Sequence, residues 1–212
     1  MTRLSRILRR LSSVALVLGA VAWAGSASAQ FFGVNADVAI SYAATNVTAK
    51  SVSGGSVGIT HPIPMIPNIG VTALSFSETE ASSVTSPSSS KLTLTTKVKL
   101  QTINFFYHIP FPIVTMAVGA GYGTIKTSAN AVLDSTTEDL SDKGNVAEGY
   151  IHIGLPFYNM LEFHLGYHLL SAPKLDRLKG TNKDYSSHTA SNIEQKKSYS
   201  GGMTTVGLQI AF

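Results

Sequence analysis

The stretch that decides the fold is residues 202–212, which read Gly-Met-Thr-Thr-Val-Gly-Leu-Gln-Ile-Ala-Phe. Val206, Leu208, Ile210 and Phe212 occupy every second position, and small or polar residues stand between them. Because successive side chains of a β-strand point to opposite faces, this alternation predicts a strand whose two faces meet different surroundings. Alternation alone does not say which face meets water, since soluble sandwiches and membrane barrels share the pattern with the two faces exchanged.

The first 29 residues have the composition of an export signal. Four arginines precede an apolar run at about residues 14–24, and Ala27-Ser28-Ala29 forms a small-x-small cleavage site before Gln30. The apolar run is shorter than the ~20 residues that a transmembrane helix needs. We therefore predict a secretory signal peptide at residues 1–29 and a single mature domain at residues 30–212. A retained N-terminal anchor is the alternative.

Loss of that segment would change the charge balance of the chain. The full sequence has 16 Lys and Arg against 12 Asp and Glu. Four of the arginines and none of the acids lie within residues 1–29, so the mature part has equal numbers of positive and negative side chains. Nucleic-acid binding, which needs a basic surface, is not indicated. The chain has no cysteine, so no disulfide holds the fold.

Between the two ends the alternation recurs about eight times. Three turns that contain proline begin near His61, His108 and Gly154, about 47 residues apart, and each joins two alternating segments. Polar stretches at about residues 46–55, 78–90, 126–144 and 171–199 join the remaining segments. Short turns that alternate with long loops are typical of outer-membrane barrels. We expect strands at about residues 31–43, 57–61, 69–77, 92–106, 114–123, 147–154, 161–169 and 202–212.

Hydrogen bonding gives the physical reason for closure. In hydrocarbon every backbone N–H and C=O needs a partner, so a sheet with an open edge is not viable in a membrane. Pairing of the first and last strands would remove both edges. The sequence thus predicts an all-β fold, namely a closed eight-stranded antiparallel up-and-down transmembrane β-barrel.

The first strand indicates which way the faces point. Val34, Val38 and Ile40 share an apolar face, which also carries Tyr42, whereas the other face is small or polar without being rich in Lys or Glu. A crowded barrel interior prefers such residues, so we expect apolar side chains to face lipid. Polar side chains would then fill the lumen and pair there, because isolated buried charges are costly. The predicted lumen cluster is Asp37, Lys97, Lys99, Glu148, Tyr150, His152, Glu162, His164 and His168.

Two stretches resemble a known family. His61-Pro62-Ile63-Pro64-Met65-Ile66-Pro67-Asn68 resembles the His-Pro-(Ile/Val)-Pro-Leu-Leu-Pro-Asn turn of small proteobacterial outer-membrane β-barrel proteins of unassigned function. Residues 161–168, followed by Leu175-Asp176, resemble the penultimate strand of that family and the loop after it. The terminal Phe212, with Ile210 and Leu208, resembles the signal that the barrel-insertion machinery reads. The resemblance implies the outer membrane of a Gram-negative cell envelope and no known activity.

No residue pattern indicates catalysis or a cofactor. His152 should lie across from Glu162 or His164, and a His/Glu/His set could bind Zn²⁺. His164 and His168, however, stand about 13 Å apart along a strand and cannot share an ion. His168 and Ser171 would point to opposite faces, and His188 has serine neighbours only in a Ser- and Lys-rich loop. We therefore expect no catalytic, cofactor-binding or metal site.

The leading hypothesis is a non-enzymatic outer-membrane barrel that presents polar surface loops. The alternatives are a narrow pore or small-solute conduit, a lipid A-modifying enzyme, and a secreted soluble barrel that binds an apolar ligand. The expected partners are outer-membrane lipid, lipopolysaccharide and the insertion machinery. The basic loop at residues 171–199 could contact anionic lipopolysaccharide. Its cations are Lys174, Arg177, Lys179, Lys183, Lys196 and Lys197.

Overall fold

The computed structural model describes residues 32–44, 47, 52–63, 65–85, 89–111, 113–133, 136–158, 161–179 and 194–212. The predicted signal peptide, residues 1–29, lies outside these ranges. Within the described part of the chain, no helix is long and apolar enough to cross a membrane.

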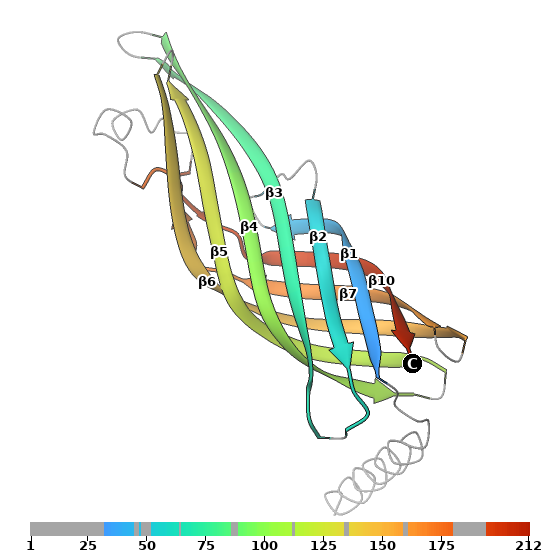
Figure 1. Cartoon of the computed structure of the whole chain (residues 1–212). Coiled ribbons are helices and arrows are strands. Elements are labelled where there is room, and N and C mark those ends of the chain that lie inside the picture. Colours follow the sequence, from blue (N-terminus) through green and yellow to red (C-terminus); the bar gives the residue numbers. More distant parts are fainter. Residues whose placement is uncertain are drawn as a thin grey trace, which may run out of the picture.

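Eight strands close into one antiparallel barrel (Figure 1). They are β1 (Gly33–Ala44), β2 (Val52–Thr60), β3 (Asn68–Thr85), β4 (Ser89–Pro110), β5 (Thr115–Leu133), β6 (Thr136–Tyr158), β7 (Leu161–Ser171) and β10 (Gly201–Ala211). Each barrel strand pairs with the next one along the chain, and β1 pairs with β10 so that Gly33 lies opposite Ala211. The predicted fold class is confirmed. Two short strands, β8 (Lys174–Asp176) and β9 (Lys196–Ser198), form a separate small sheet.

Four of the strands are much longer than the rest. β3, β4, β5 and β6 have 18 to 23 residues, whereas β1, β2, β7 and β10 have 9 to 12. In Figure 1 the long strands rise well beyond their shorter neighbours. The predicted loops at residues 78–90 and 126–144 are therefore wrong for the most part, since both regions are largely strand. Their Ser, Thr and Asn residues accept extended backbone because the inner face still buries Ala129, Ala131 and Leu140.

The long strands divide the molecule into two zones. The upper zone comprises residues 74–85 of β3, 89–100 of β4, 125–133 of β5 and 136–146 of β6, together with β8 and β9. The lower zone is the remainder of the barrel, next to the three turns. In the lower zone Val38, Ile153 and Leu165 point outward and are exposed, while Asp37 and His168 are buried inside. The predicted orientation, apolar outward and polar inward, is that of the lower zone.

The upper zone has the opposite arrangement. Leu92, Leu94 and Val98 are completely buried inside, and Lys97 and Lys99 are exposed outside. The prediction that Lys97 and Lys99 lie in the lumen is wrong, and Val98 faces inward although apolar side chains were expected to face lipid. In a sheet that meets water on one side, the outer face carries polar side chains and the apolar face packs on the core. The upper part of β4 belongs to such a sheet, so its apolar side chains face inward.

A β-bulge corrects one further prediction. The register between β1 and β10 shifts between Ala39 and Ser41, so that Ile40 and Ser41 are both exposed. A bulge inserts an extra residue and reverses which side chains face inward after it. Tyr42, predicted on the outward face, is therefore buried, and its ring stacks on Phe76 with 4.8 Å between centroids.

Candidate functional site

A network of buried polar side chains fills the lumen of the lower zone. β1 contributes Asp37, β6 contributes Glu148 and His152, and β7 contributes His164 and His168. Asp37 and His164 meet because both lie opposite Gly207 of β10, one from each neighbouring strand. A Cβ atom at Gly207 would come within 2.3 Å of Asp37 Oδ1, so the glycine leaves the space in which the two side chains approach each other.

Carboxylates hold the two ends of this network. His164 Nε2 lies 2.7 Å from Glu162 Oε1, and His168 Nδ1 lies 2.6 Å from Glu148 Oε1. Between them, His152 Nε2 lies 2.9 Å from His168 Nε2. These distances are those of hydrogen bonds, and charged acceptors make such bonds short and strong.

Neutral side chains surround the carboxylate of Glu148. The hydroxyl of Thr102 donates to Glu148 Oε2, and the hydroxyl oxygen of Thr72 lies 3.1 Å from Glu148 Oε1. With its amide nitrogen facing Glu148, Asn104 donates to Oε2 over 2.8 Å. Sequence reasoning missed these three residues. The available signal was their alternation along β3 and β4 with Val71 and Ile103, which are exposed on the outer face.

Asp37 stands between two histidines at distances longer than a hydrogen bond. Its Oδ2 lies 3.9 Å from His152 Nδ1, and its Oδ1 lies 3.8 Å from His164 Nδ1. Its Oδ2 accepts a hydrogen bond from the Ser56 hydroxyl, over 3.2 Å. One ligand atom from each of Asp37, His152 and His164 fits within a mutual distance of 4.8 Å, a grouping that could hold a metal ion.

The structure places most of the predicted lumen residues together. Asp37, Glu148, His152, His164 and His168 are buried inside the barrel. Tyr150 is partly buried and stacks on His168 with 4.7 Å between ring centroids, and Glu162 is partly buried beside Thr115. The observed neighbours of His152 differ from the predicted ones, however. His152 lies opposite Gly166, and its nearest partners are His168 and Asp37, not Glu162.

A second charged cluster lies inside the upper zone. Arg177 Nη2 lies 3.0 Å from Glu80 Oε2, and Lys197 Nζ lies 2.7 Å from Glu78 Oε2. The hydroxyl of Tyr199 also donates to Glu78, over 3.0 Å. Arg177 and Lys197 are buried, so the loop at residues 171–199 is less basic on its surface than its sequence suggested. The sequence did not reveal this cluster because Glu78 and Glu80 precede Arg177 and Lys197 by about 100 residues.

The electrostatics of this upper cluster are set by its ion pairs. Burial alone would raise the pKa of the Glu80 carboxyl, but hydrogen bonds from Arg177 and Lys197 outweigh burial and lower that pKa below its usual 4.5. On the outside of the zone, a hydrogen bond from Lys179 lowers the pKa of Asp142.

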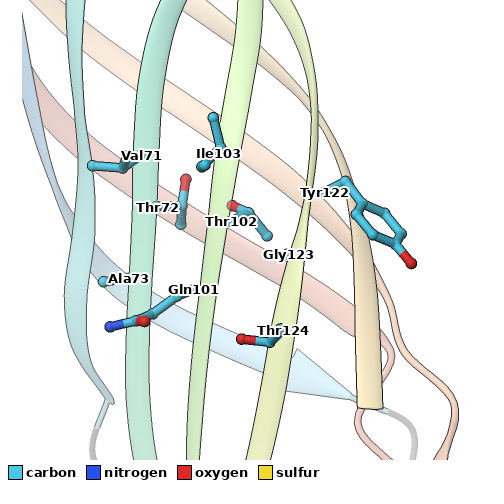
Figure 2. Close-up of a pocket in the computed structure, with 9 residues that line it drawn as sticks. All are labelled: Val71, Thr72, Ala73, Gln101, Thr102, Ile103, Tyr122, Gly123 and Thr124. Atoms are coloured by element: carbon cyan, nitrogen blue, oxygen red, sulfur yellow. The ribbon is translucent and has the colours of Figure 1, made fainter.

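A shallow hollow and a row of lysines mark the outer boundary between the zones. The hollow lies on β3, β4 and β5, and Figure 2 shows Tyr122 beside it, pointing away from the barrel wall. Lys99 pairs with Lys126 across β4 and β5, and Lys126 pairs with Lys143 across β5 and β6. All three are exposed, and among the described residues none of them forms an ion pair.

Comparisons with known proteins find similarity in structure. The sequence matches no protein-family model, and no curated protein matches it in sequence. Neisserial surface protein A is similar in structure with a TM-score of 0.48 and 14% identity, over 85% of this chain and 97% of that one. The attachment invasion locus protein Ail of Yersinia pestis gives a TM-score of 0.41 and 8% identity, over 85% and 95%. A major outer membrane protein from Thermus thermophilus gives 0.43 and 10%, over 85% and 99%. The chain has in common with Neisserial surface protein A the fold, a closed eight-stranded antiparallel β-barrel.

Proposed function

We propose that the protein is an integral outer-membrane β-barrel without enzymatic activity. We further propose that the row of lysines on the outer wall of β4, β5 and β6 contacts lipopolysaccharide. The observation that supports the membrane assignment most directly is the inversion of the lower zone. Apolar side chains point outward from every strand there, and the polar side chains are enclosed. Hydrocarbon is the solvent in which that arrangement is stable, since a lipid-facing surface must be apolar and a closed barrel pairs all its backbone groups.

The dimensions of the lower zone support the same orientation. Ten residues separate Met116, next to the turn side, from Lys126 on the same outward face. At about 3.3 Å per residue and a tilt of about 45°, ten residues rise about 23 Å. That rise is close to the apolar band of about 25 Å in outer-membrane barrels. The turns would then lie on the periplasmic side, and the upper zone would project from the cell surface.

The lysine row would lie at the outer edge of the membrane. Like charges directly opposite each other across strands are destabilising, and Lys99, Lys126 and Lys143 stand in that relation. An anionic partner removes the repulsion. Phosphate groups of lipopolysaccharide lie at this depth, and each Lys near an anionic surface contributes about 1 kcal/mol by analogy with anionic leaflets. Directly below, the hollow beside Val71, Ile103 and Tyr122 offers apolar contact to an acyl chain.

The interior argues against the conduit alternative. A layer of buried side chains crosses the barrel between the polar lumen and the upper cluster, and it includes Tyr42, Phe76, Leu100, Ile125 and Met203. Such a layer is a dry barrier to ions and polar solutes. We expect no steady conductance when the protein is inserted into planar bilayers, and a sustained single-channel current would contradict this part of the proposal.

The lipopolysaccharide contact can be tested by charge removal. In the refolded protein, changing Lys99, Lys126 and Lys143 together to Gln should lower lipopolysaccharide binding by at least tenfold, because three unopposed cations are lost. A matched control changes Lys174, Lys179 and Lys196 to Gln. These lysines are exposed but lie outside the lysine row, so this variant should bind as the wild type does. Lipid A without phosphates should bind equally to all three proteins.

Two results would overturn the proposal. Equal binding by the two triple variants would remove the assigned role of the lysine row. A mature chain that stays soluble without detergent and does not enter liposomes would remove the membrane assignment itself.

A further inference from the structure

For neutral histidines, the hydrogen bonds of the lumen network assign the ring nitrogens that carry protons. Glu162 accepts at His164 Nε2, which therefore carries a proton. Glu148 accepts at His168 Nδ1, so a neutral His168 has its lone pair on Nε2, and there it accepts from His152 Nε2. In neutral histidine only one nitrogen is protonated. Both His152 Nδ1 and His164 Nδ1 are then bare lone pairs.

Both Nδ1 atoms lie near the same carboxylate. His152 Nδ1 and His164 Nδ1 lie 3.9 and 3.8 Å from the two oxygens of Asp37. Within the described part of the chain, the buried Asp37 Oδ1 and His164 Nδ1 have no hydrogen-bond partner. Three electron-pair donors thus lie within 4.8 Å of one another, and unpaired buried polar atoms are costly. The arrangement calls for a positive centre between them.

The spacing suits a metal ion better than a hydrogen bond. Hydrogen-bond distances run from about 2.7 to 3.2 Å, well short of the two distances seen here. In a tetrahedral zinc site with bonds of about 2.1 Å, neighbouring ligand atoms are about 3.4 Å apart. Closing the two gaps to Asp37 to that value takes movements of a few tenths of an ångström by each side chain, while the group as a whole, which spans up to 4.8 Å, must contract by about 1.4 Å.

The charge of the network also favours a cation. Asp37, Glu148 and Glu162 bring three carboxylates into the lower lumen. The buried cations of the described chain, Arg177 and Lys197, lie in the upper cluster with Glu78 and Glu80. A divalent ion would offset most of the negative charge that neutral histidines leave uncompensated.

We propose that Asp37, His152 and His164 bind one divalent transition-metal ion, with Zn²⁺ as the ion that best suits two imidazoles and a carboxylate. The fourth position is open to water. Glu162 holds His164 in place, and His168, itself held by Glu148, does the same for His152. Such outer partners orient metal-bound histidines and raise their affinity. The ion would tie β1 to β6 and β7 across β10, the strand at which the barrel closes.

The test uses the full mature chain, expressed without a histidine tag and refolded in detergent micelles. Equilibrium dialysis against Zn²⁺ should give one ion per chain, and binding should move the unfolding midpoint upward. Asp37→Asn should lower the affinity at least tenfold. Glu162→Gln and Glu148→Gln should each lower it by about 10- to 100-fold through loss of the outer partners. His61→Gln, in the first turn and outside the network, should bind as the wild type does.

A second measurement keeps the proposal falsifiable if Asp37→Asn does not fold. X-ray absorption of the Zn²⁺-loaded wild type should show two imidazole ligands and oxygen. Zinc bound by fewer than two imidazoles would overturn the assignment. So would a folded Asp37→Asn protein that binds Zn²⁺ as tightly as the wild type, or a wild type that binds none, in which case a proton on His164 is the positive centre.

Discussion

The two zones of β4 differ in chemistry but not in geometry. Its even-numbered residues face inward along the whole strand, from Leu92 and Leu94 in the upper zone to Asn104 and Phe106 in the lower. Above, the inward residues are largely apolar and the outward ones include lysines. Below, the inward residues include the polar Thr102 and Asn104 besides Phe106, and the outward ones are Ile103, Phe105 and Tyr107. One continuous alternating strand thus passes from a water-facing zone to a lipid-facing zone. The change of surroundings is visible only in which residues occupy the two faces of the strand.

The difference shows that a hydrophobic face marks the side away from water, not the side towards the protein interior. In the lower zone the polar lumen is stabilised by hydrogen bonds among its own side chains. In the upper zone apolar packing fills the interior, and a single cluster around Arg177 is charged among the described residues. The following substitutions test this division, beginning with the largest expected effect.

Removal of Arg177, one of the buried cations of the upper zone, should lower the free energy of unfolding the most. Arg177→Ala leaves Glu78 and Glu80 with Lys197 alone, and loss of one partner from a buried ion cluster costs about 3–5 kcal/mol of the free energy of unfolding. Circular dichroism during urea unfolding in micelles would measure this. Lys179→Ala is the control, because its pair with Asp142 lies at the surface, and it should leave the unfolding curve unchanged. Equal curves for both variants would mean that the upper cluster is not closed to water.

Truncation of one leucine in each zone tests the packing. Leu100→Ala removes a buried side chain from the apolar cluster and should cost about 2–5 kcal/mol. Leu165→Ala removes an outward side chain that is 51% exposed, where lipid or detergent fills the space, so its cost should be well below that of Leu100→Ala. The same unfolding measurement applies, and the reverse order would show that the interior of the upper zone is loosely packed.

A charge on the outer wall separates the solvents of the two zones directly. Leu165→Arg places a cation on the outward face of the lower zone and should cost about 2–4 kcal/mol in lipid bilayers. Thr95→Arg makes the same change on the outward face of the upper zone, where water already solvates charges, so no loss is expected. Refolding into liposomes of defined composition would compare the two, and tolerance of both variants would place Leu165 outside the membrane.

Acidity should destabilise the upper zone. The pKa of Glu80 is lowered in the folded protein, so the stability that this carboxylate contributes is present above about pH 4.5 and is lost as the pH falls through its folded value. Unfolding curves measured at a series of pH values from about 6 downward should therefore show stability that declines below about pH 4.5. Glu80→Gln should flatten that decline, and an unchanged slope would assign the pH dependence to other carboxyls.

The sequence predicts the barrel because alternation, turn spacing and closure are local or topological features. It did not predict the upper zone, although the alternating lysines of residues 92–100 were the available signal of a water-facing wall. Tyr42 was misplaced because nothing in residues 39–41 announces a bulge. The grouping of Asp37 with His152 and His164 depends on register across β10 and on the space beside Gly207. Residues so far apart in the chain reveal that grouping only after the strands are aligned.

The unequal strand lengths have a consequence for how the backbone exchanges its amide protons. β2 accompanies β3 only as far as the pair Val52 and Phe76, and beyond Phe76 the described chain pairs β3 with β4 alone. Along residues 77–85, every second amide then has no partner strand in the described chain, whereas residues 69–76 pair with strands on both sides. Deuterium uptake along this one strand should rise sharply past Phe76 and, in doing so, trace the height at which the closed cylinder becomes an open sheet.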